Sequence, residues 1–327
     1  MTDTVRWGIL ATGRIARLFT EDLLLTGRQV AAVGSRSLQN AERFAAEFGI
    51  AKAYGSYEEL LADPGVDVVY VATPHPFHAE NALGALQAGK HVLLEKPFTL
   101  NASEAQQVVD LAKVKGLVVL EAMWTRFLPH MKRVREIVAS GILGEVRMIV
   151  ADHMQRLPDD PAHRVNALAL GGGALLDLGI YPISFAWHLL GPPRSFEAAA
   201  RFRPTGADAE IAVILRHETD AISSLLAASD ITGPNLAAVV GTEGRIAIGS
   251  PWYRPTTARL VSHNGDVLEE FSSPVVGRGR QYQADELERL VREGRTAGEI
   301  LPPQESVDIM RALDAIRARI GLRYPNE

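Results

Sequence analysis

The amino-acid sequence predicts an α/β protein in two parts: a doubly wound parallel sheet, then an α+β part with a large, open, mostly antiparallel sheet. Up to residue 121, short apolar runs alternate with amphipathic stretches, as in a parallel sheet covered on both faces. After residue 121, strand-like runs follow one another with few helices between them. We therefore expect domains at 1–121 and 122–327, and a length of 327 residues also favours two domains.

The first part alternates strands with helices. Buried strands are expected at 5–10, 30–34, 66–72, 91–94 and 117–120, and helices at 14–25, 38–48, 77–88 and 102–114. Asn101 is expected to cap the last of these helices, because Glu104 follows it at the spacing of a capping box.

The second part is dominated by strands. Strands are expected at 146–152, 195–202, 211–216, 221–228, 236–241, 245–248, 259–263 and 267–271, and helices at 129–140, 280–293 and 304–320. The exposed face of such a sheet is a candidate surface for a homodimer or a higher oligomer. The long apolar run 167–190 has the length of a membrane span, but glycines, Asp177, Pro182 and His188 interrupt it. We interpret it as a loop followed by a buried helix.

Composition excludes several classes of function. The net charge is only -5 and no basic block occurs, which argues against a nucleic-acid partner. The chain has no cysteine, so disulfides, thiolate catalysis and cysteine metal sites are excluded. The first residues lack the basic and apolar regions of a signal peptide, and we expect a cytoplasmic protein.

The turn from Gly8 to Ala16 predicts a dinucleotide site of the Rossmann type. A pyrophosphate requires close backbone approach and a helix N-terminus, whose amides attract anions. The glycine pattern is a variant, because Ala11 occupies the second glycine position when counting starts at Gly8. The alternative is an ordinary tight turn. The residues expected to contact the cofactor here are Gly8, Ala11, Thr12, Gly13, Arg14 and Ile15.

The end of the second strand bears on the choice between NADP and NAD. NAD enzymes usually carry an acid here for the ribose hydroxyls, and this chain carries Ser35 and Arg36 instead. A guanidinium suits phosphate geometry, so we expect NADP, with NAD possible. An ordinary solvated arginine is the alternative.

Thr73, Pro74 and His78 follow the strand at 66–72. Ligands of open parallel sheets collect beyond the carboxyl ends of strands, so these residues are expected to line the cofactor cleft. His75 and His78 suggest a metal pair, but no further ligands are spaced nearby, and we expect no metal.

The segment Glu95-Lys96-Pro97 is expected to carry chemistry. It ends an apolar strand, which would place Lys96 near a bound nicotinamide, with Glu95 at the same edge. A lysine has a pKa of ~10.4 and must be lowered toward ~7–8 to act as a base near neutral pH. Alternatively Lys96 stays protonated and stabilises charge on a substrate oxygen. The alternative is that Lys96 is an ordinary surface lysine beside Glu95 with no catalytic role.

Asp177 and Tyr181 lie four residues apart, hence on one face of the expected helix. A buried carboxylate needs a partner, and Lys96 is the expected one. Tyr181 would donate a proton to a substrate oxygen or take one from it. The alternative is a purely structural one, in which the tyrosine is a hydrogen-bonded core residue and the aspartate caps the helix.

These segments together resemble the Gfo/Idh/MocA oxidoreductases, over nearly the whole chain. Residues 121–127 look most like the dimeric dihydrodiol dehydrogenases and the NADP-dependent D-xylose dehydrogenases. The resemblance implies that Lys96, Asp177 and Tyr181 are catalytic and that Trp124 and Arg126 lie near nicotinamide and substrate. It also implies that the C-terminal sheet pairs with a second subunit. Many members carry histidine where Tyr181 stands, which puts an inositol-type histidine mechanism in doubt.

We therefore expect hydride transfer between nicotinamide and a hydroxyl-bearing carbon of a sugar, cyclic polyol or trans-dihydrodiol. The alternatives are a non-catalytic dinucleotide sensor on the same fold, or an enzyme that recycles its cofactor internally. The polar segment 152–171 is expected to close over the substrate, which the sequence does not identify.

Overall fold

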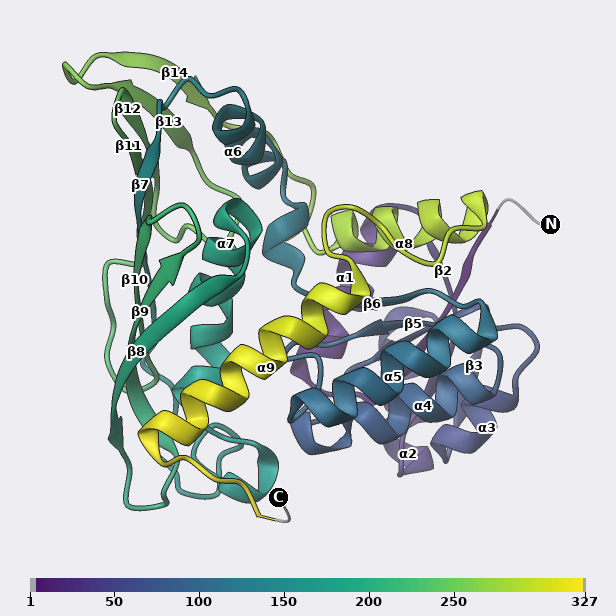
Figure 1. Cartoon of the computed structure of the whole chain (residues 1–327). Coiled ribbons are helices and arrows are strands. Elements are labelled where there is room, and N and C mark those ends of the chain that lie inside the picture. The colour runs from purple at the N-terminus through teal and green to yellow at the C-terminus, as the bar shows by residue number, and fades with distance from the viewer. Residues whose placement is uncertain (1–3, 326–327) are drawn as a thin grey trace. The chain divides into compact units, whose positions relative to one another are not determined.

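The computed structural model describes residues 4–325, which form two compact units (Figure 1). The first unit contains the chain up to Trp124 together with Val275–Met310. The second contains Thr125–Pro274 and the chain from Arg311 on. The predicted division at 121 and 122 therefore differs from the observed one mainly in segment 275–310, which returns to the N-terminal unit.

A parallel sheet of six strands forms the first unit, in the order β3-β2-β1-β4-β5-β6. This is the predicted doubly wound sheet, and its order reverses between β1 and β4. Its strands are β1 (Arg6–Leu10), β2 (Gln29–Gly34), β3 (Lys52–Tyr54), β4 (Val68–Val71), β5 (His91–Leu94) and β6 (Val119–Glu121). Its helices are α1 (Arg14–Leu25), α2 (Leu38–Phe48), α3 (Tyr57–Ala62), α4 (His78–Gln87), α5 (Ala102–Lys115) and α8 (Gln281–Glu293), with the short 3-10 helix η1 (His75–Phe77).

The expected helix start at Asn101 is confirmed. The Asn101 side chain accepts a hydrogen bond from the amide of Glu104 at 3.0 Å, and the Glu104 carboxylate accepts one from the amide of Leu100 at 3.1 Å. Strand β3 and helix α3 were not expected. Each is short, and the α3 start depends on Ser56, whose hydroxyl accepts from the amide of Glu59.

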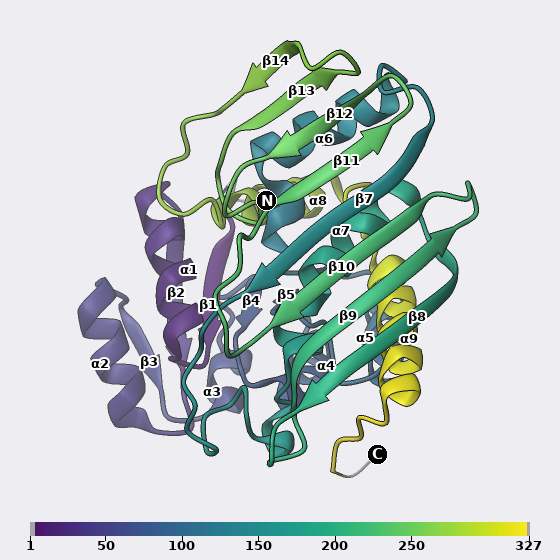
Figure 2. The same cartoon turned by 90° about the vertical axis from the view of Figure 1, so that its left-hand side faces the viewer.

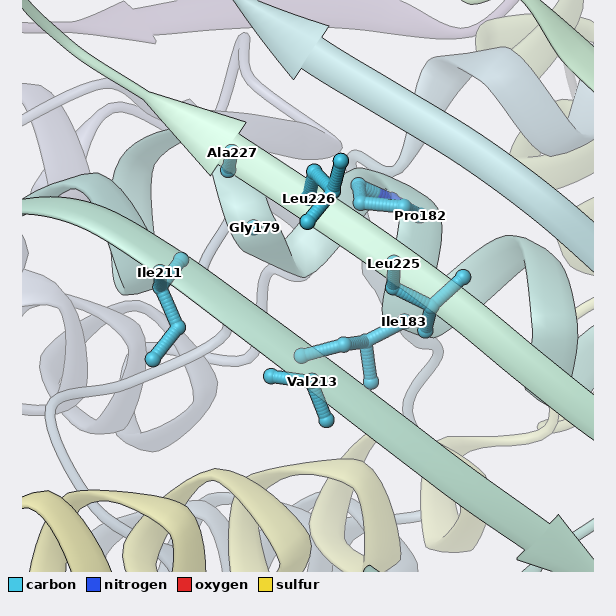
Figure 3. A pocket seen from close by; sticks show the side chains of 8 residues that line it. All are labelled: Gly179, Pro182, Ile183, Ile211, Val213, Leu225, Leu226 and Ala227. Atoms are coloured by element: carbon cyan, nitrogen blue, oxygen red, sulfur yellow. The ribbon is translucent and has the colours of Figure 1, made fainter. Parts of the chain in front are cut away.

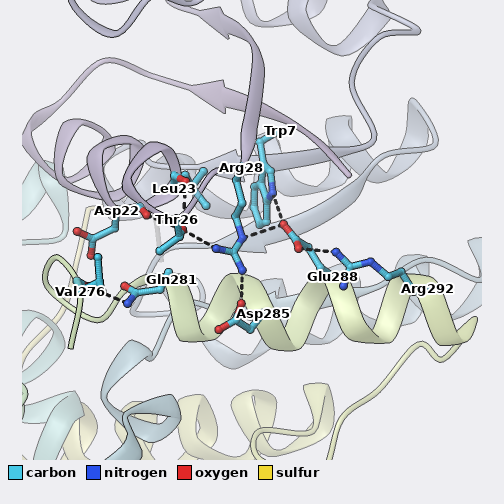
Figure 4. A network of polar contacts seen from close by, with 10 residues as sticks. All are labelled: Trp7, Asp22, Leu23, Thr26, Arg28, Val276, Gln281, Asp285, Glu288 and Arg292. Atoms are coloured by element: carbon cyan, nitrogen blue, oxygen red, sulfur yellow. Dashed lines mark hydrogen bonds and ion pairs between the residues drawn. The ribbon is translucent and has the colours of Figure 1, made fainter. Parts of the chain in front are cut away.

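Helix α8 belongs to the first unit because polar contacts join it to α1 and β1 (Figure 4). The indole of Trp7 donates to Glu288 at 2.9 Å, and Glu288 also pairs with Arg28 at 3.0 Å. Arg28 forms a second ion pair with Asp285. The carboxylate of Asp22, buried on α1, accepts backbone amides of the segment that precedes α8. These long-range contacts are invisible in local sequence patterns, which explains the misplaced segment.

The second unit holds an eight-stranded sheet in the order β14-β13-β12-β11-β7-β10-β9-β8 (Figure 2). As predicted it is mostly antiparallel, and the pair β10 and β7 is parallel. The strands are β7 (Val146–Met154), β8 (Pro193–Phe202), β9 (Asp208–His217), β10 (Ile222–Ala228), β11 (Ala237–Gly241), β12 (Gly244–Ile248), β13 (Ala258–Ser262) and β14 (Val267–Phe271). Helices α6 (Pro129–Ala139) and α7 (Ile180–Leu190) belong to the same unit, and α9 (Pro303–Ile320) and the 3-10 helix η2 (Trp124–Phe127) each cross between the units.

The two faces of this sheet differ. One face packs against α7, with Ile149, Val213 and Leu225 buried. The other face leaves large apolar side chains partly exposed in the middle of the sheet, namely Met148, Val150, Ile214 and Leu226. The eight-stranded sheet therefore has the exposed face that was expected of a mostly antiparallel sheet.

The apolar run before α7 folds as a 3-10 turn (Leu168–Leu170), a loop, a π-helical turn (Leu175–Gly179, labelled η4) and then α7. Among the described residues, Leu168–Leu190 is long and apolar enough to cross a membrane, and 83% of that window is buried inside the protein. Burial of this extent is typical of a helix in the core of a folded domain.

Candidate active site

Four turns of the first unit meet along the carboxyl edge of the parallel sheet. The residue after each strand donates its amide to the neighbouring strand end: Ala11 to Gly34 (2.9 Å), Ala72 to Leu10 (3.1 Å), Glu95 to Val71 (3.1 Å) and Ala122 to Leu94 (2.7 Å). These bonds continue the sheet by one residue and hold the turns side by side. The segments that the sequence analysis singled out in this unit therefore share one edge, where ligands of doubly wound sheets bind.

The turn after β1 fits the pyrophosphate of a dinucleotide. Gly13 caps α1 without a side-chain hydrogen bond, no acid lies in the first turn, and a side chain added at Gly13 would meet nothing within 4 Å. The first amides of α1 thus face an open, electropositive helix end. Ala11 has a left-handed φ of 85°, a conformation that usually selects glycine. Thr12, Arg14 and Ile15 lie on this same turn, with Arg14 exposed.

Gly8 has a different explanation. It lies inside β1, and a Cβ there would approach the side chain of Val66 to 2.8 Å. Close packing therefore accounts for this glycine without a ligand, and the pattern that begins at Ala11 matches the turn better.

The end of β2 carries no carboxylate within Ser35, Arg36 and Ser37. Ser35 is buried, and its hydroxyl accepts from the amide of Ser37 at 3.4 Å. Arg36 is exposed, with its guanidinium 6.0 Å from the centre of the Phe77 ring. This places a positive charge and hydroxyl groups where the cofactor ribose is expected.

His78 has a structural role within the first unit. The side chain is fully buried, with Nδ1 at 2.8 Å from the carbonyl oxygen of Pro97 and Nε2 at 2.9 Å from that of Thr73. Burial lowers the pKa of His78 to about 4, so the neutral ring donates to one of these oxygens at a time. Its ring nitrogens thus connect the turn after β4 to the turn after β5, and a contact of this residue with the cofactor stays a prediction.

The Glu95 carboxylate is equally internal. It accepts the hydroxyl hydrogen of Tyr70 and lies 3.3 Å from the amide of Lys96, and burial raises its pKa. Lys96 is partly buried and follows Glu95 at the carboxyl end of β5. Glu95 thus anchors the turn, and Lys96 extends from it. Thr73 and Pro74 lie on the adjacent turn, with Thr73 buried.

Arg280 was not anticipated from the sequence. Its guanidinium carbon lies 4.5 Å from the centre of the buried Trp124 ring, and its charge acts on Glu95. Arg280 is more than 150 positions away from both residues along the chain, so no local pattern indicates their proximity.

In the second unit, Asp177 and Tyr181 lie on one continuous helical run, but not with α-helical geometry. Asp177 lies in the π-helical turn and Tyr181 is the second residue of α7, so the expectation of one regular helix with α-helical i, i+4 spacing is corrected. Asp177 is buried and accepts a hydrogen bond from Arg164 at 3.1 Å. Arg164 comes from segment 152–171, the one that was expected to cover the substrate.

Asp208 positions the start of this helical run. It is fully buried on β9, its carboxylate accepts from the amide of Leu175 at 2.6 Å, and burial raises its pKa to about 6. Gly173 is required beside it, since a Cβ there would lie 1.9 Å from the carboxylate.

Tyr181 lies in an aromatic cluster within its own unit. Its ring meets the edge of His153 at 4.7 Å between centres, and His153 stacks on Tyr253 at 3.8 Å. Gln155 bridges the two, 2.6 Å from His153 Nε2 and 3.1 Å from the Tyr253 hydroxyl oxygen. Contacts with these two rings restrain the Tyr181 ring, and no sequence pattern indicated these partners.

Arg126 is buried against α7. Its guanidinium donates to the hydroxyl of Ser184 at 2.7 Å and to the carbonyl oxygen of Ser184 at 2.8 Å, and it lies 3.3 Å from His188. Burial, with the charges of Arg126 and Arg135, lowers the pKa of His188 to about 2. These contacts connect η2 to α7, so Arg126 has a structural role.

Two other features carry no site. A pocket too small to hold a water molecule lies between α7, its preceding turn and the sheet, and only apolar residues line it, including Ile183 and Ile211 (Figure 3). It offers nothing to a hydroxylated substrate. Among residues 4–325, no group of three or more metal-ligating side chains occurs.

Comparison with known proteins agrees with this geometry. Residues 5–123 match the profile described as "Oxidoreductase family, NAD-binding Rossmann fold", and residues 131–247 match the GFO/IDH/MocA C-terminal domain. A trans-1,2-dihydrobenzene-1,2-diol dehydrogenase of Mus musculus is 37% identical, over 99% of both chains. A D-xylose 1-dehydrogenase (NADP(+)) of Hypocrea jecorina is 36% identical, over 98% of this chain and 93% of its own.

One solved structure extends the comparison. The crystal structure of an aldose-aldose oxidoreductase from Caulobacter crescentus, complexed with glycerol, matches with a TM-score of 0.88 and 25% identity over 97% of both chains. The resemblance seen in the sequence is therefore confirmed over both units. The chain belongs to the Gfo/Idh/MocA family of oxidoreductases.

Proposed function

We propose that this protein is an NADP-dependent dehydrogenase that oxidises a CH–OH group of a sugar, cyclic polyol or trans-dihydrodiol. The observation that carries the proposal is the shared carboxyl edge of the first unit. There the open start of α1, the acid-free end of β2 with Arg36, and Lys96 lie on neighbouring turns. The relatives, which act on D-xylose and on a dihydrodiol, support the substrate class.

The preference for NADP follows from charge. A 2′-phosphate carries negative charge that a carboxylate at the end of β2 would repel, and this chain has Arg36 and two serines there. Gly13, Arg14 and Ile15 would hold the pyrophosphate with their amides, and Thr73 and Pro74 would flank the nicotinamide half. Trp124 and Arg126 are proposed near the nicotinamide, Trp124 through its ring and Arg126 by holding η2 in place.

A bound NADP would supply the hydride acceptor for oxidation of the carbinol carbon. The chain's own task is the hydroxyl proton, which Tyr181 or Lys96 removes as the carbonyl forms. Asp177 is proposed to orient Lys96, and Arg164 shares its carboxylate. Segment 152–171 is proposed to cover the substrate.

A second candidate is internal recycling of a tightly held cofactor, in which one substrate is oxidised and another reduced. The similarity to an aldose-aldose oxidoreductase favours it specifically. The same residues would serve both half-reactions, since proton removal and proton donation by Tyr181 or Lys96 are the reverse of each other.

A homodimer through the open face of the eight-stranded sheet is part of the proposal. Val150 pairs across the ladder with Ser224, which pairs with Ile214, so the exposed apolar side chains are contiguous. Such a patch marks an interaction surface, and charged residues such as Arg201 and Glu210 border it on β8 and β9. The absence of cysteine is compatible with the cytoplasm, which we propose as the location.

The direct test is absorbance at the reduced-nicotinamide band. Purified protein would be mixed with NADP or NAD and a panel of aldoses, cyclic polyols and trans-dihydrodiols. Steady reduction with one substrate class, faster with NADP, is the expected result. Tight cofactor binding without release of NADPH, but with conversion of paired sugars, would instead support internal recycling. Binding with neither reaction would leave a dinucleotide sensor.

A further inference from the structure

The backbone of Arg280 is held firmly at the start of α8. The fully buried carboxylate of Asp22 accepts the amides of Arg278 and Arg280, each at 3.0 Å. Gly277, with a φ of 64°, allows this approach, because a Cβ there would lie 2.5 Å from the same carboxylate. Gln281 closes the segment by donating to the carbonyl oxygen of Val276 at 2.8 Å (Figure 4). The Arg280 side chain therefore starts from a fixed point.

From this point the guanidinium reaches the carboxyl edge of β5 and β6. Its carbon lies 4.5 Å from the centre of the Trp124 ring, close enough for a cation–π contact. Its charge also acts on the carboxylate of Glu95. Trp124 follows β6 and Glu95 follows β5, directly before Lys96. Arg280 therefore lies at the same carboxyl edge of the parallel sheet as Lys96, and both residues belong to the first unit.

The Arg280 guanidinium has N–H donors that are available to a ligand. No hydrogen bond or ion pair joins it to any residue from 4 to 325, and its Nε is buried without a partner. Leaving a buried donor unsatisfied costs about 1–3 kcal/mol. A guanidinium carries several N–H donors in a planar fork that matches a carboxylate or phosphate.

The local charge favours an anion. Arg280 and Lys96 bring two cationic side chains to this edge, and the charges of both act on the carboxylate of Glu95. Glu95 is already engaged with Tyr70. We propose that Arg280 is a specificity-determining residue that binds an anionic oxygen, carboxylate or phosphate, of the sugar or polyol substrate. The inference rests on the proposed function, because it places the substrate at this edge.

The test is calorimetric binding to protein saturated with NADPH, so that no oxidation accompanies it. D-Glucuronate, D-glucose 6-phosphate and D-glucose would be titrated into the wild type and three variants. Arg280→Met keeps an unbranched side chain against Trp124 without charge, and Arg280→Lys keeps the charge without the fork. Arg278→Met is the matched control, because Arg278 lies in the same segment but pairs with Glu21.

The wild type is expected to bind at least one anion ~10-fold or more tightly than D-glucose, the effect of a charged hydrogen bond. Arg280→Met should abolish that advantage, Arg280→Lys should retain part of it, and Arg278→Met should leave it unchanged. Preference for the carboxylate alone would indicate a sugar acid, and preference for the phosphate alone a sugar phosphate. Equal binding of all three ligands, no binding of either anion, or a preference that survives Arg280→Met would overturn the proposal.

NADPH affinity and thermal midpoint would be measured for every variant, and Arg280→Lys carries the test if Arg280→Met does not fold. The two proposals fail separately. Anion binding that depends on Arg280 without NADP reduction by any substrate would refute the dehydrogenase. Reduction with neutral sugars and no anion preference would refute the role of Arg280.

Discussion

The two sheets of this protein differ in what they leave exposed: the parallel sheet only the ends of its strands, and the eight-stranded sheet one of its faces. The parallel sheet has helices on both faces, and its central strands β4 and β5 are buried almost throughout. The eight-stranded sheet alternates buried and open residues, and its central strands leave apolar side chains partly exposed. A sheet covered on both faces can meet a ligand only at the ends of its strands. A sheet covered on one face can meet a partner across its surface.

The strongest test of this contrast removes the charge at the strand edge. Lys96→Met should lower kcat by ~10²–10⁴-fold, the usual effect of losing a group that handles a proton. The NADP dissociation constant should stay within about threefold, because the pyrophosphate and ribose sites lie on other turns. Steady-state kinetics and cofactor titration measure both. Lys113→Met on α5 is the control. An equal loss of NADP affinity would show that Lys96 binds cofactor rather than handling the proton.

The open face of the other sheet is tested by Val150→Asp. Val150 is 42% exposed in the chain, so a single subunit should tolerate the charge. A dimer would bury it twice, and the dimer dissociation constant should rise by ~100-fold or more. Sedimentation velocity over a range of concentrations measures this. Val267→Asp, at an exposed position on the edge strand β14, should have no such effect. An unchanged assembly would place the interface elsewhere.

Asp208 offers a test of how the second sheet supports the proposed catalytic helix. Because burial raises its pKa from 3.8 to about 6, the folded state holds a proton that the unfolded state releases. Stability should therefore fall as pH rises from about 4 to about 6, by a few kcal/mol at most, and level off above. In Asp208→Asn this component should be absent. Urea unfolding across that range, with Asp220→Asn as an exposed control, gives the comparison. Identical pH profiles would contradict it.

The smallest expected effect concerns cofactor choice at the edge of the first sheet. Arg36→Ala should raise the KM for NADP by ~10–100-fold, as for one charged hydrogen-bonding partner lost, and leave the KM for NAD within about twofold. Arg43→Ala, exposed on the following helix α2, is the control. A parallel rise for both cofactors would mean that Arg36 supports the turn rather than reading the phosphate.

Local patterns predicted the parallel half well. Helices α1 and α2 have the bounds expected from their apolar spacing, and strand β5 does too. Lys96 was located because a lysine just after a mostly apolar strand lies at the carboxyl end of that strand. The position of His78 suggested a ligand contact for the same reason, but its burial and its two carbonyl partners could be known only from the tertiary structure.

The sequence by itself therefore determined which segments form strands and helices, the family, and the residue types available for hydride chemistry. These depend on neighbours within a few positions, through periodicity, caps and turns. Tertiary structure alone decided that α8 joins the first unit, that Asp208 supports the helical run of Asp177, and that the Arg280 guanidinium lies over the Trp124 ring. Those facts rest on contacts between residues far apart in the chain, whose partners are chosen by packing and charge in three dimensions.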